Sequence, residues 1–268
     1  MLQNFIITFR ETLEAALIIG IILSYLARIK QTKYNNVIYI GVAAGIIASI
    51  IGALIFTEIA GGFTGRAEQI FEGVTMLIGA ALLTTMIFWM MKQKHIASEL
   101  EHKVSTELNE AHKFGLFLLV FVAVLREGIE TVIFLGAASF VSTGNSLTGS
   151  LAGIAAAVLL GYAIFVGSMK IDLKKFFNIT SVLLILFAAG LVAHGIHEFE
   201  EAGIIPIVVE HVWDINSILN ENGLVGSMLK GLFGYNGNPS LIEVLSYIIY
   251  VISVLIFWKN IERVHKVI

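Results

Sequence analysis

The fold follows from two charged stretches, Arg10-Glu11-Thr12-Leu13-Glu14 and Arg126-Glu127-Gly128-Ile129-Glu130. Both fit the pattern Arg-Glu-x-x-Glu, they begin 116 residues apart, and each interrupts a long apolar run. An ionisable side chain costs about 2.5–3.5 kcal/mol at the centre of a membrane helix. The six charged side chains should therefore face one another or a water-filled path, and not lipid.

The composition predicts an integral membrane protein. Of 268 residues, 57% are apolar and only 14% are charged, and the mean hydropathy is +0.87. Soluble domains carry about a quarter of their residues as charged ones. The net charge of −3 excludes a strongly basic nucleic-acid binder, and the absence of cysteine excludes disulfides, thiolate metal sites and cysteine nucleophiles. We expect a single transmembrane domain over residues 1–268 and no enzyme.

Run length predicts an all-α fold, because a membrane helix needs about 20 apolar residues. Seven spans are expected, at roughly 4–27, 36–58, 69–91, 114–140, 147–169, 176–199 and 241–258. Residues 200–240 contain both prolines and should form an extracytoplasmic segment. Its apolar residues suggest short helices at the membrane interface: Trp213, Ile215, Ile218, Leu219, Leu224, Met228 and Leu232.

The distribution of basic residues predicts the orientation. Outside the spans, thirteen Lys and Arg residues fall on one side, and only Arg66 and Lys230 fall on the other. Because cytoplasmic loops carry the excess of positive charge, the N-terminus should face outside and the C-terminus the cytoplasm. Ser142 is then extracytoplasmic and Lys103 cytoplasmic.

The recurring motif also predicts an internal repeat. Residues 4–91 and 114–199 would each form a three-helix unit, with a weaker echo between Gly52–Phe56 and Gly161–Phe165. Because three is odd, the second unit enters the membrane from the opposite face. Inverted repeats with functional groups near the midplane are a transporter architecture. The span at 241–258 stands outside the repeat.

Helix geometry predicts ion pairs within each motif, because the arginine and the second glutamate are four residues apart. This pairing leaves the first glutamates, Glu11 and Glu127, without a partner. Four carboxylates against two guanidinium groups give a net charge of −2, so we expect protons or a metal ion there. Oxygen ligands alone favour a hard cation, although they do not separate iron from manganese or calcium.

A second polar group lies at the outer end of the span at 176–199. His194, His197, Glu198 and Glu201 fall on one helical face, while Glu200 is expected to turn away. With Glu72 they would form an acidic vestibule that raises the local cation concentration. The alternative is a set of ordinary interfacial polar residues. In the connector at 92–113, a metal site is less favoured than a solvated helix, and the residues concerned are His95, Glu99, His102 and Glu110.

The two motifs resemble those of the high-affinity iron permeases, the oxidase-dependent iron transporter family, in its compact bacterial form. The similarity extends to Phe71–Gly73, Met86–Met90, His197–Gly203 and Leu232–Tyr235. The resemblance implies iron uptake across the plasma membrane, the inner membrane of a bacterium, with iron as substrate and no bound organic cofactor. It also implies an extracytoplasmic partner that oxidises or binds iron. The implied site comprises the ligands Glu11, Glu14, Glu127 and Glu130, balanced in charge by Arg10 and Arg126.

Two other functions stay open on sequence alone. The first is a proton-coupled secondary transporter for another cation, such as manganese, another divalent metal or a cationic amino acid. The second is a membrane-embedded carboxylate metal oxidase. Such oxidases typically use Glu-x-x-His on two helices, and the motifs around Glu14 and Glu130 lack that histidine. The oxidase is therefore the less favoured of the two.

Overall fold

The computed structural model describes residues 1–92, 96–109, 113–141, 146–165, 173–221 and 223–267, and these ranges contain helices but no β-strand. The helices are α1 (Leu2–Arg28), α2 (Asn35–Gly61), α3 (Arg66–Lys92), α4 (Ile96–Asn109), α5 (Lys113–Val141), α6 (Ser146–Phe165), α7 (Leu173–Glu201), α8 (Leu224–Phe233) and α9 (Leu241–Val267), with a short 3-10 helix at Thr32–Tyr34. The predicted all-α membrane fold is confirmed at this level.

Five helical segments are long and apolar enough to cross a membrane: Thr32–Gly61, Arg66–Met90, Leu147–Phe165, Ile179–Glu201 and Leu241–Asn260. Helices α1 and α5 are also long enough, at 27 and 29 residues. They fall outside this set because each carries the three charged residues of its motif. Five candidate spans are thus found where the sequence predicts seven, so the count of seven stays a prediction.

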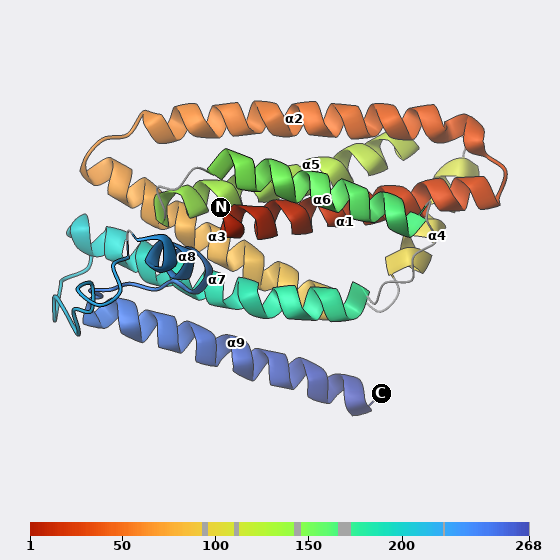
Figure 1. Cartoon of the computed structure of the whole chain (residues 1–268). Coiled ribbons are helices and arrows are strands. Elements are labelled where there is room, and N and C mark those ends of the chain that lie inside the picture. The colour runs from red at the N-terminus through yellow and green to blue at the C-terminus, as the bar shows by residue number, and fades with distance from the viewer. Residues whose placement is uncertain (93–95, 110–112, 142–145, 166–172, 222, 268) are drawn as a thin grey trace.

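The long helices alternate in direction between two ends of the bundle (Figure 1). In chain order α1, α2, α3, α5, α6, α7 and α9 each run opposite to the one before. The turn at 29–34, the connector helix α4 and the C-terminus lie at one end, whereas the turn at 62–65 and the segment at 202–240 lie at the other. The polar connections that the sequence assigns to opposite sides therefore gather at opposite ends of the bundle.

Three helix pairs form most of the core. Helix α1 packs most extensively against α6, α5 against α2, and α3 against α7. The α3–α7 crossing is close because two glycines meet there: a Cβ added to Gly73 would lie 2.9 Å from the Gly195 carbonyl oxygen. One apolar cluster is built largely from α3, α5 and α7, around Leu83, Phe134 and Leu191.

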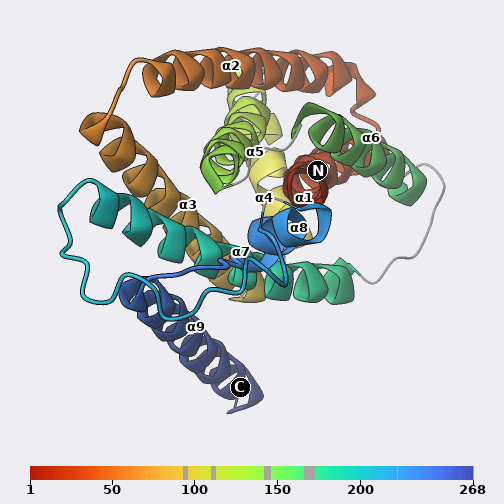
Figure 2. The same ribbon diagram turned by 60° about the vertical axis from the view of Figure 1, so that its left-hand side comes forward.

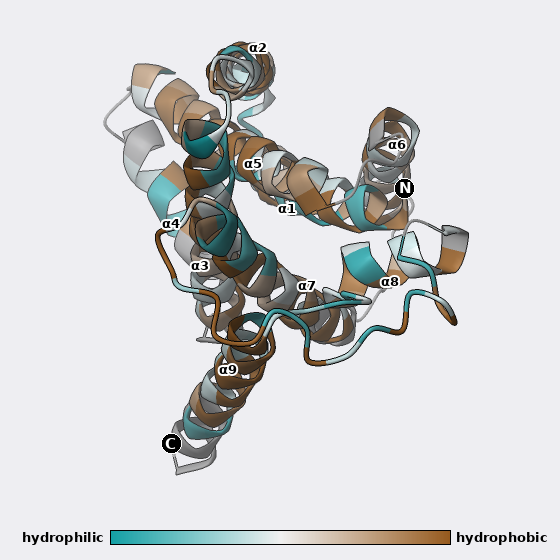
Figure 3. Ribbon diagram, turned by 90° about the vertical axis from the view of Figure 1, so that its left-hand side faces the viewer, coloured by the Kyte–Doolittle hydropathy of each residue, from teal (hydrophilic) through white to brown (hydrophobic). Residues whose placement is uncertain are grey.

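The outward surface of the bundle is apolar, as a lipid-facing surface requires. Large hydrophobic side chains are exposed along α2, α6 and α9, for example Leu54, Leu159 and Phe257. In Figure 3, the brown that marks hydrophobic residues runs along the helices, including α2, α6 and α9. Helix α9 packs chiefly on α7 and projects away from the other helices (Figure 2).

The segment at 202–240 differs in part from the prediction. Helix α8 provides one of the expected short helices, but the residues from Trp213 to Leu219 lie in non-helical chain, so a helix there was wrongly predicted. The backbone of this stretch is bonded elsewhere: Val212 N–H donates to the Pro239 carbonyl and Ile215 N–H to that of Gly237. Two stretches of irregular chain thus satisfy each other's backbone groups, which removes the need for a helix.

The connector at 92–113 contains α4, which confirms the predicted helix. His102 is exposed on it, but Val104 is fully buried in an apolar cluster with Leu26 of α1 and Leu116 of α5. Arg28 of α1 forms an ion pair with Glu101 at 2.5 Å. His95, Glu110 and the side chain of Glu99 lie outside the described residues.

Candidate functional site

The two Arg-Glu-x-x-Glu motifs meet in the middle of the bundle. Glu14 is the thirteenth of the 27 residues of α1, and Glu127 is the fifteenth of the 29 residues of α5. The two helices pack together and run in opposite directions (Figure 1). As a result, carboxylate oxygens of Glu11, Glu14 and Glu127 lie within 4.8 Å of one another.

Arg10 bridges both glutamates of its own motif. Its side chain is fully buried, with Nη1 2.9 Å from Glu11 Oε1 and Nη2 3.0 Å from Glu14 Oε1. The predicted pair with Glu14 is confirmed, but the expectation that Glu11 has no partner was wrong. The long arginine side chain presents several donors in a fork, so it reaches both the neighbouring residue and the one a turn away.

Arg126 occupies a different environment from Arg10. It is 46% exposed, its Nε donates to Glu130 Oε1 at 2.8 Å, and its guanidinium lies 5.2 Å from the centre of the Trp89 ring. The predicted pair is confirmed here, and Glu127 forms no ion pair among the described residues. Glu127 is only 5% exposed. It is therefore the one buried carboxylate of the two motifs without a guanidinium neighbour in contact.

Several carboxylate oxygens of the motifs are buried without a hydrogen-bond donor among the described residues. They include Glu11 Oε2, Glu127 Oε2 and Glu130 Oε2, whereas Glu14 Oε1 has its ion-pair contact with Arg10. Glu130 is also an electrostatic neighbour of Glu14, which joins it to the other three glutamates. Leaving a buried charged acceptor unsatisfied costs more than the roughly 1–3 kcal/mol of a neutral group. We call Glu11, Glu14, Glu127 and Glu130 the carboxylate cage, and its chemistry suits a cation.

Helix α3 contributes side chains to the site that the sequence did not assign to it. The sulfur atoms of Met86 and Met90 lie 2.7 and 2.8 Å from guanidinium nitrogens of Arg10, and Trp89 contacts Arg126. The spacing of the two methionines indicates a shared helical face. Which helix that face meets is decided only by the tertiary packing.

The polar residues at the end of α7 divide into two groups. Towards α3, Glu198 lies close enough to Glu72 and Glu201 for their charges to interact, and Gln69 donates to Glu201 at 3.0 Å. His194 is only 7% exposed, its Nδ1 lies 3.0 Å from the Gly190 carbonyl oxygen, and it is close enough to His197 for their charges to interact. The contact between His197 and Glu201 joins the two groups.

Towards α9, His197 joins two glutamates. His197 Nδ1 lies 3.0 Å from Glu243 Oε1 and Nε2 3.2 Å from Glu201 Oε1. Ligand atoms of His197, Glu200 and Glu243 all lie within 4.8 Å of one another. The expectation that Glu200 turns away from the group was wrong: it is one helical turn from His197, only 4% exposed, and accepts a 2.6 Å bond from Ser240 Oγ.

Glu243 was missed by the sequence reasoning, although a signal for it exists. Ser240 and Glu243 form a capping box at the start of α9, with Ser240 N–H donating to Glu243 Oε1 at 3.0 Å and Glu243 N–H donating to Ser240 Oγ at 3.2 Å. The pattern Ser-x-x-Glu before an apolar run predicts such a helix start. It does not predict that the same carboxylate contacts α7.

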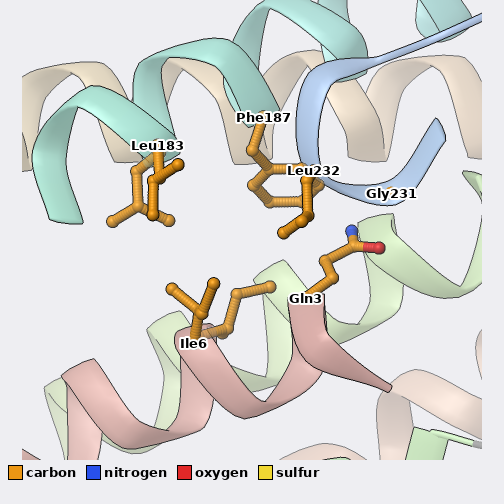
Figure 4. Close-up of a pocket in the computed structure, with 8 residues that line it drawn as sticks. Gln3, Ile6, Leu183, Phe187, Gly231 and Leu232 are labelled. Atoms are coloured by element: carbon orange, nitrogen blue, oxygen red, sulfur yellow. The ribbon is translucent and has the colours of Figure 1, made fainter. Parts of the chain in front are cut away.

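A small pocket lies beside the N-terminal part of α1, where α8 crosses it (Figure 4). It is lined by Gln3, Ile6, Ile7, Leu183, Leu184, Phe187, Gly231 and Leu232. Gln3 is its only polar side chain, so the pocket lacks charged ligands for an ion. Its lining residues on α1 are Gln3, Ile6 and Ile7, which precede the first motif.

The family model and the relatives that match this chain are all described as iron permeases. A model of the Iron permease FTR1 family matches residues 1–261. The ferrous iron permease EfeU of Yersinia pestis is 37% identical over 262 residues, which cover 96% of this chain and 93% of that protein. The protein of the same name from Escherichia coli O6:H1 is 36% identical over 260 residues, covering 96% and 94%. No solved structure matches the chain.

Proposed function

The chain belongs to the iron permease FTR1 family, and on this premise we propose that it carries iron across the membrane through the carboxylate cage. The resemblance found in the motifs is thereby confirmed. The relatives are permeases by name, which agrees with a transporter and not an enzyme. With its candidate spans and bacterial relatives, the chain is a multi-pass membrane protein of the kind predicted for a bacterial inner membrane.

The observation that carries this proposal is the unbalanced negative charge at the middle of α1 and α5. Four glutamates face two arginines there, and at least three of the carboxylate oxygens are buried without a donor among the described residues. A cation between the two helices would satisfy these oxygens. Helix-borne charges that face a protein interior at membrane depth typically mark an ion pathway.

Iron is the cargo that best fits the combined observations. Carboxylate oxygens bind hard cations, so the cage by itself suits manganese as well as iron. The names of the relatives specify ferrous iron. We therefore propose ferrous iron as the ion presented to this chain, and oxidation by an extracytoplasmic partner stays a prediction of the family resemblance.

Uptake into vesicles tests the proposed substrate. We expect proteoliposomes that contain the purified chain to accumulate ⁵⁵Fe, supplied as ferrous iron under ascorbate, faster than ⁵⁴Mn at the same concentration. Empty liposomes, and liposomes with the Glu127→Gln variant, serve as controls for leakage. Manganese uptake equal to or faster than iron uptake would instead favour the secondary transporter for another cation.

The packing of the helices supports two inverted three-helix units. The first unit would comprise α1, α2 and α3, and the second α5, α6 and α7. Helix α1 then corresponds to α5 and α2 to α6, so the pair α1–α6 is equivalent to the pair α5–α2. These are two of the three most extensive pairs in the bundle. The third pair, α3–α7, joins the equivalent last helices of the two units.

Two matching contacts support the same relation. A Cβ added to Gly20 of α1 would meet the ring of Phe165 on α6, and one added to Gly136 of α5 would meet the ring of Phe56 on α2. Gly136 lies 116 residues after Gly20, which is the spacing of the two motifs. Phe56 and Phe165 are the residues that close the weaker sequence echo. Equivalent glycines thus accept equivalent rings.

Cysteine labelling tests the proposed orientation, which places the end of the bundle with α4 in the cytoplasm. Ser142 lies outside the described residues, so the exposed Thr64, between α2 and α3, is the better outer position. In intact spheroplasts we expect an impermeant maleimide to label Thr64→Cys but not Lys103→Cys. Both should react after the membrane is opened. The chain has no native cysteine, so the unmodified protein is the background control, and the reverse pattern would overturn the orientation.

A further inference from the structure

We propose that His197 and Glu200 of α7 and Glu243 of α9 form a second metal site, which takes a divalent transition-metal ion and is separate from the carboxylate cage. Glu200 and Glu243 were not part of the vestibule expected from the sequence. The further role of binding iron before it reaches the carboxylate cage rests on the proposed function. Metal binding at this site does not rest on it, because binding can be measured on protein that does not transport.

The positions of the ligand atoms fit one ion. One atom from each of the three residues lies within 4.8 Å of the others, which two metal–ligand bonds of about 2.0–2.5 Å can span. His197 Nδ1 and Glu243 Oε1 are 3.0 Å apart. Neighbouring ligands of an octahedral ion with bonds of about 2.1 Å are separated by about the same distance.

Glu200 supplies an independent indication of a missing ligand. Only 4% of Glu200 is exposed, so its carboxylate lies in the protein interior. Its Oε1 has no hydrogen-bond partner among the described residues, whereas Oε2 accepts from Ser240 Oγ. A buried carboxylate oxygen without a donor is unfavourable, and an ion held with His197 and Glu243 would satisfy it.

The surrounding residues hold the ligands in place. Ser240 orients both carboxylates, because its hydroxyl donates to Glu200 at 2.6 Å and its backbone N–H donates to Glu243 at 3.0 Å. Asn236 Nδ2 donates to Glu243 Oε2 at 2.8 Å. Ligating carboxylates in metal sites are typically hydrogen-bonded in this way. The capping box of α9 therefore also serves to fix one ligand.

The ligand types distinguish this site from the cage. The cage offers oxygen atoms only, whereas this site adds an imidazole nitrogen, which favours iron, zinc, copper or nickel over calcium and magnesium. The two sites also lie at different depths. His197 is the fifth residue from the end of α7, whereas the cage lies near the middle of α1 and α5.

Manganese binding to purified protein tests the site, because the spin of Mn²⁺ reports a coordinated nitrogen. The background is the Glu11→Gln/Glu127→Gln variant, in which the cage is weakened. We expect it to bind one Mn²⁺, with echo modulation from an imidazole nitrogen in pulsed electron paramagnetic resonance. In this background, His197→Gln should remove the nitrogen modulation. Glu200→Gln should weaken binding at least tenfold.

Glu198→Gln is the matched control, because Glu198 lies on the same helical turn but is not one of the three clustered ligands, and the largest charge interaction of its carboxylate is with Glu72 of α3. It should change the affinity less than twofold. Equal weakening by Glu198→Gln and Glu200→Gln, or nitrogen modulation that persists in His197→Gln, would overturn the site in favour of a diffuse acidic surface. So would the absence of both bound Mn²⁺ and bound Zn²⁺, the latter being an ion that imidazole ligands favour.

The same loss of modulation is expected when His197→Gln is made in the wild-type chain. This second measurement keeps the test valid if the Glu11→Gln/Glu127→Gln protein folds poorly. If iron uptake fails while this site binds, only the proposed function falls.

Discussion

Replacing Glu127 by glutamine should nearly abolish iron transport while leaving folded protein in the membrane. Glu127 is 5% exposed, forms no ion pair among the described residues, and shares a 4.8 Å cluster with Glu11 and Glu14. Glutamine keeps the size and polarity but removes one negative charge. Because mutation even of outer partners of a metal ligand typically costs about 10–100-fold in affinity or activity, loss of a ligand should cost at least as much.

The same loss is expected for Glu11→Gln, for a slightly different reason. Glu11 also pairs with Arg10, but Arg10 keeps its contact with Glu14 when Glu11 is neutralised. The protein should therefore stay folded. Uptake should be measured per molecule of membrane protein, with Glu58→Gln as the control, because Glu58 is an exposed carboxylate on α2 outside both clusters. Wild-type uptake by both cage variants would make the motifs packing elements and place the ion path elsewhere.

Removing the two arginines should have unequal effects on stability. Arg10 is fully buried and holds two carboxylates, so Arg10→Gln leaves uncompensated buried charge. Breaking a buried pair in this way typically costs about 3–5 kcal/mol. Arg126 is 46% exposed and pairs with Glu130 alone, so Arg126→Gln leaves one carboxylate without its guanidinium partner, whereas Arg10→Gln leaves two. We expect a clear drop in the melting temperature and membrane level of Arg10→Gln, and a smaller one for Arg126→Gln.

A charge-compensated variant separates stability from transport. Replacing Glu11 and Glu14 by glutamine in the Arg10→Gln protein removes the unpaired carboxylates, so the melting temperature should recover in part, whereas iron uptake should stay absent. Melting can be followed by fluorescence in detergent. Equal melting temperatures for Arg10→Gln and Arg126→Gln would show that the burial of Arg10 does not contribute to stability in the way described.

The two i, i+4 ion pairs of the site were predictable from the sequence, but the contact of Arg10 with Glu11 was not. The i, i+4 spacing predicts the Arg126–Glu130 pair because that contact is local to one helix. Around Arg10, the same rule misses the contact with Glu11. The side chain there is enclosed by Met86 and Met90 from α3, and no local spacing rule specifies a neighbour from another helix.

The polar cluster at the C-terminal end of α7 differs from its prediction for the same reason. A helical-face argument groups the residues of α7 by angle, and on that basis Glu200 should stand apart. Helix α9 packs on α7 at this point. Ser240, which caps α9, contacts Glu200, and Glu243 of α9 contacts His197, so Glu200 and His197 are brought together. The partner residues lie some 40 positions away in the chain, where the sequence shows only a helix start.

The sequence by itself determined the all-α membrane fold, the family and the residues of the carboxylate cage. Apolar run length, repeated motifs and buried charge are local or periodic features, and their physical consequences do not depend on which helices become neighbours. Only the tertiary structure decided that Arg10 forms ion pairs with two carboxylates, that Glu127 forms none among the described residues, and that His197, Glu200 and Glu243 lie together. Those facts depend on contacts between helices, because a buried charge pairs with whatever donor the packing brings within reach.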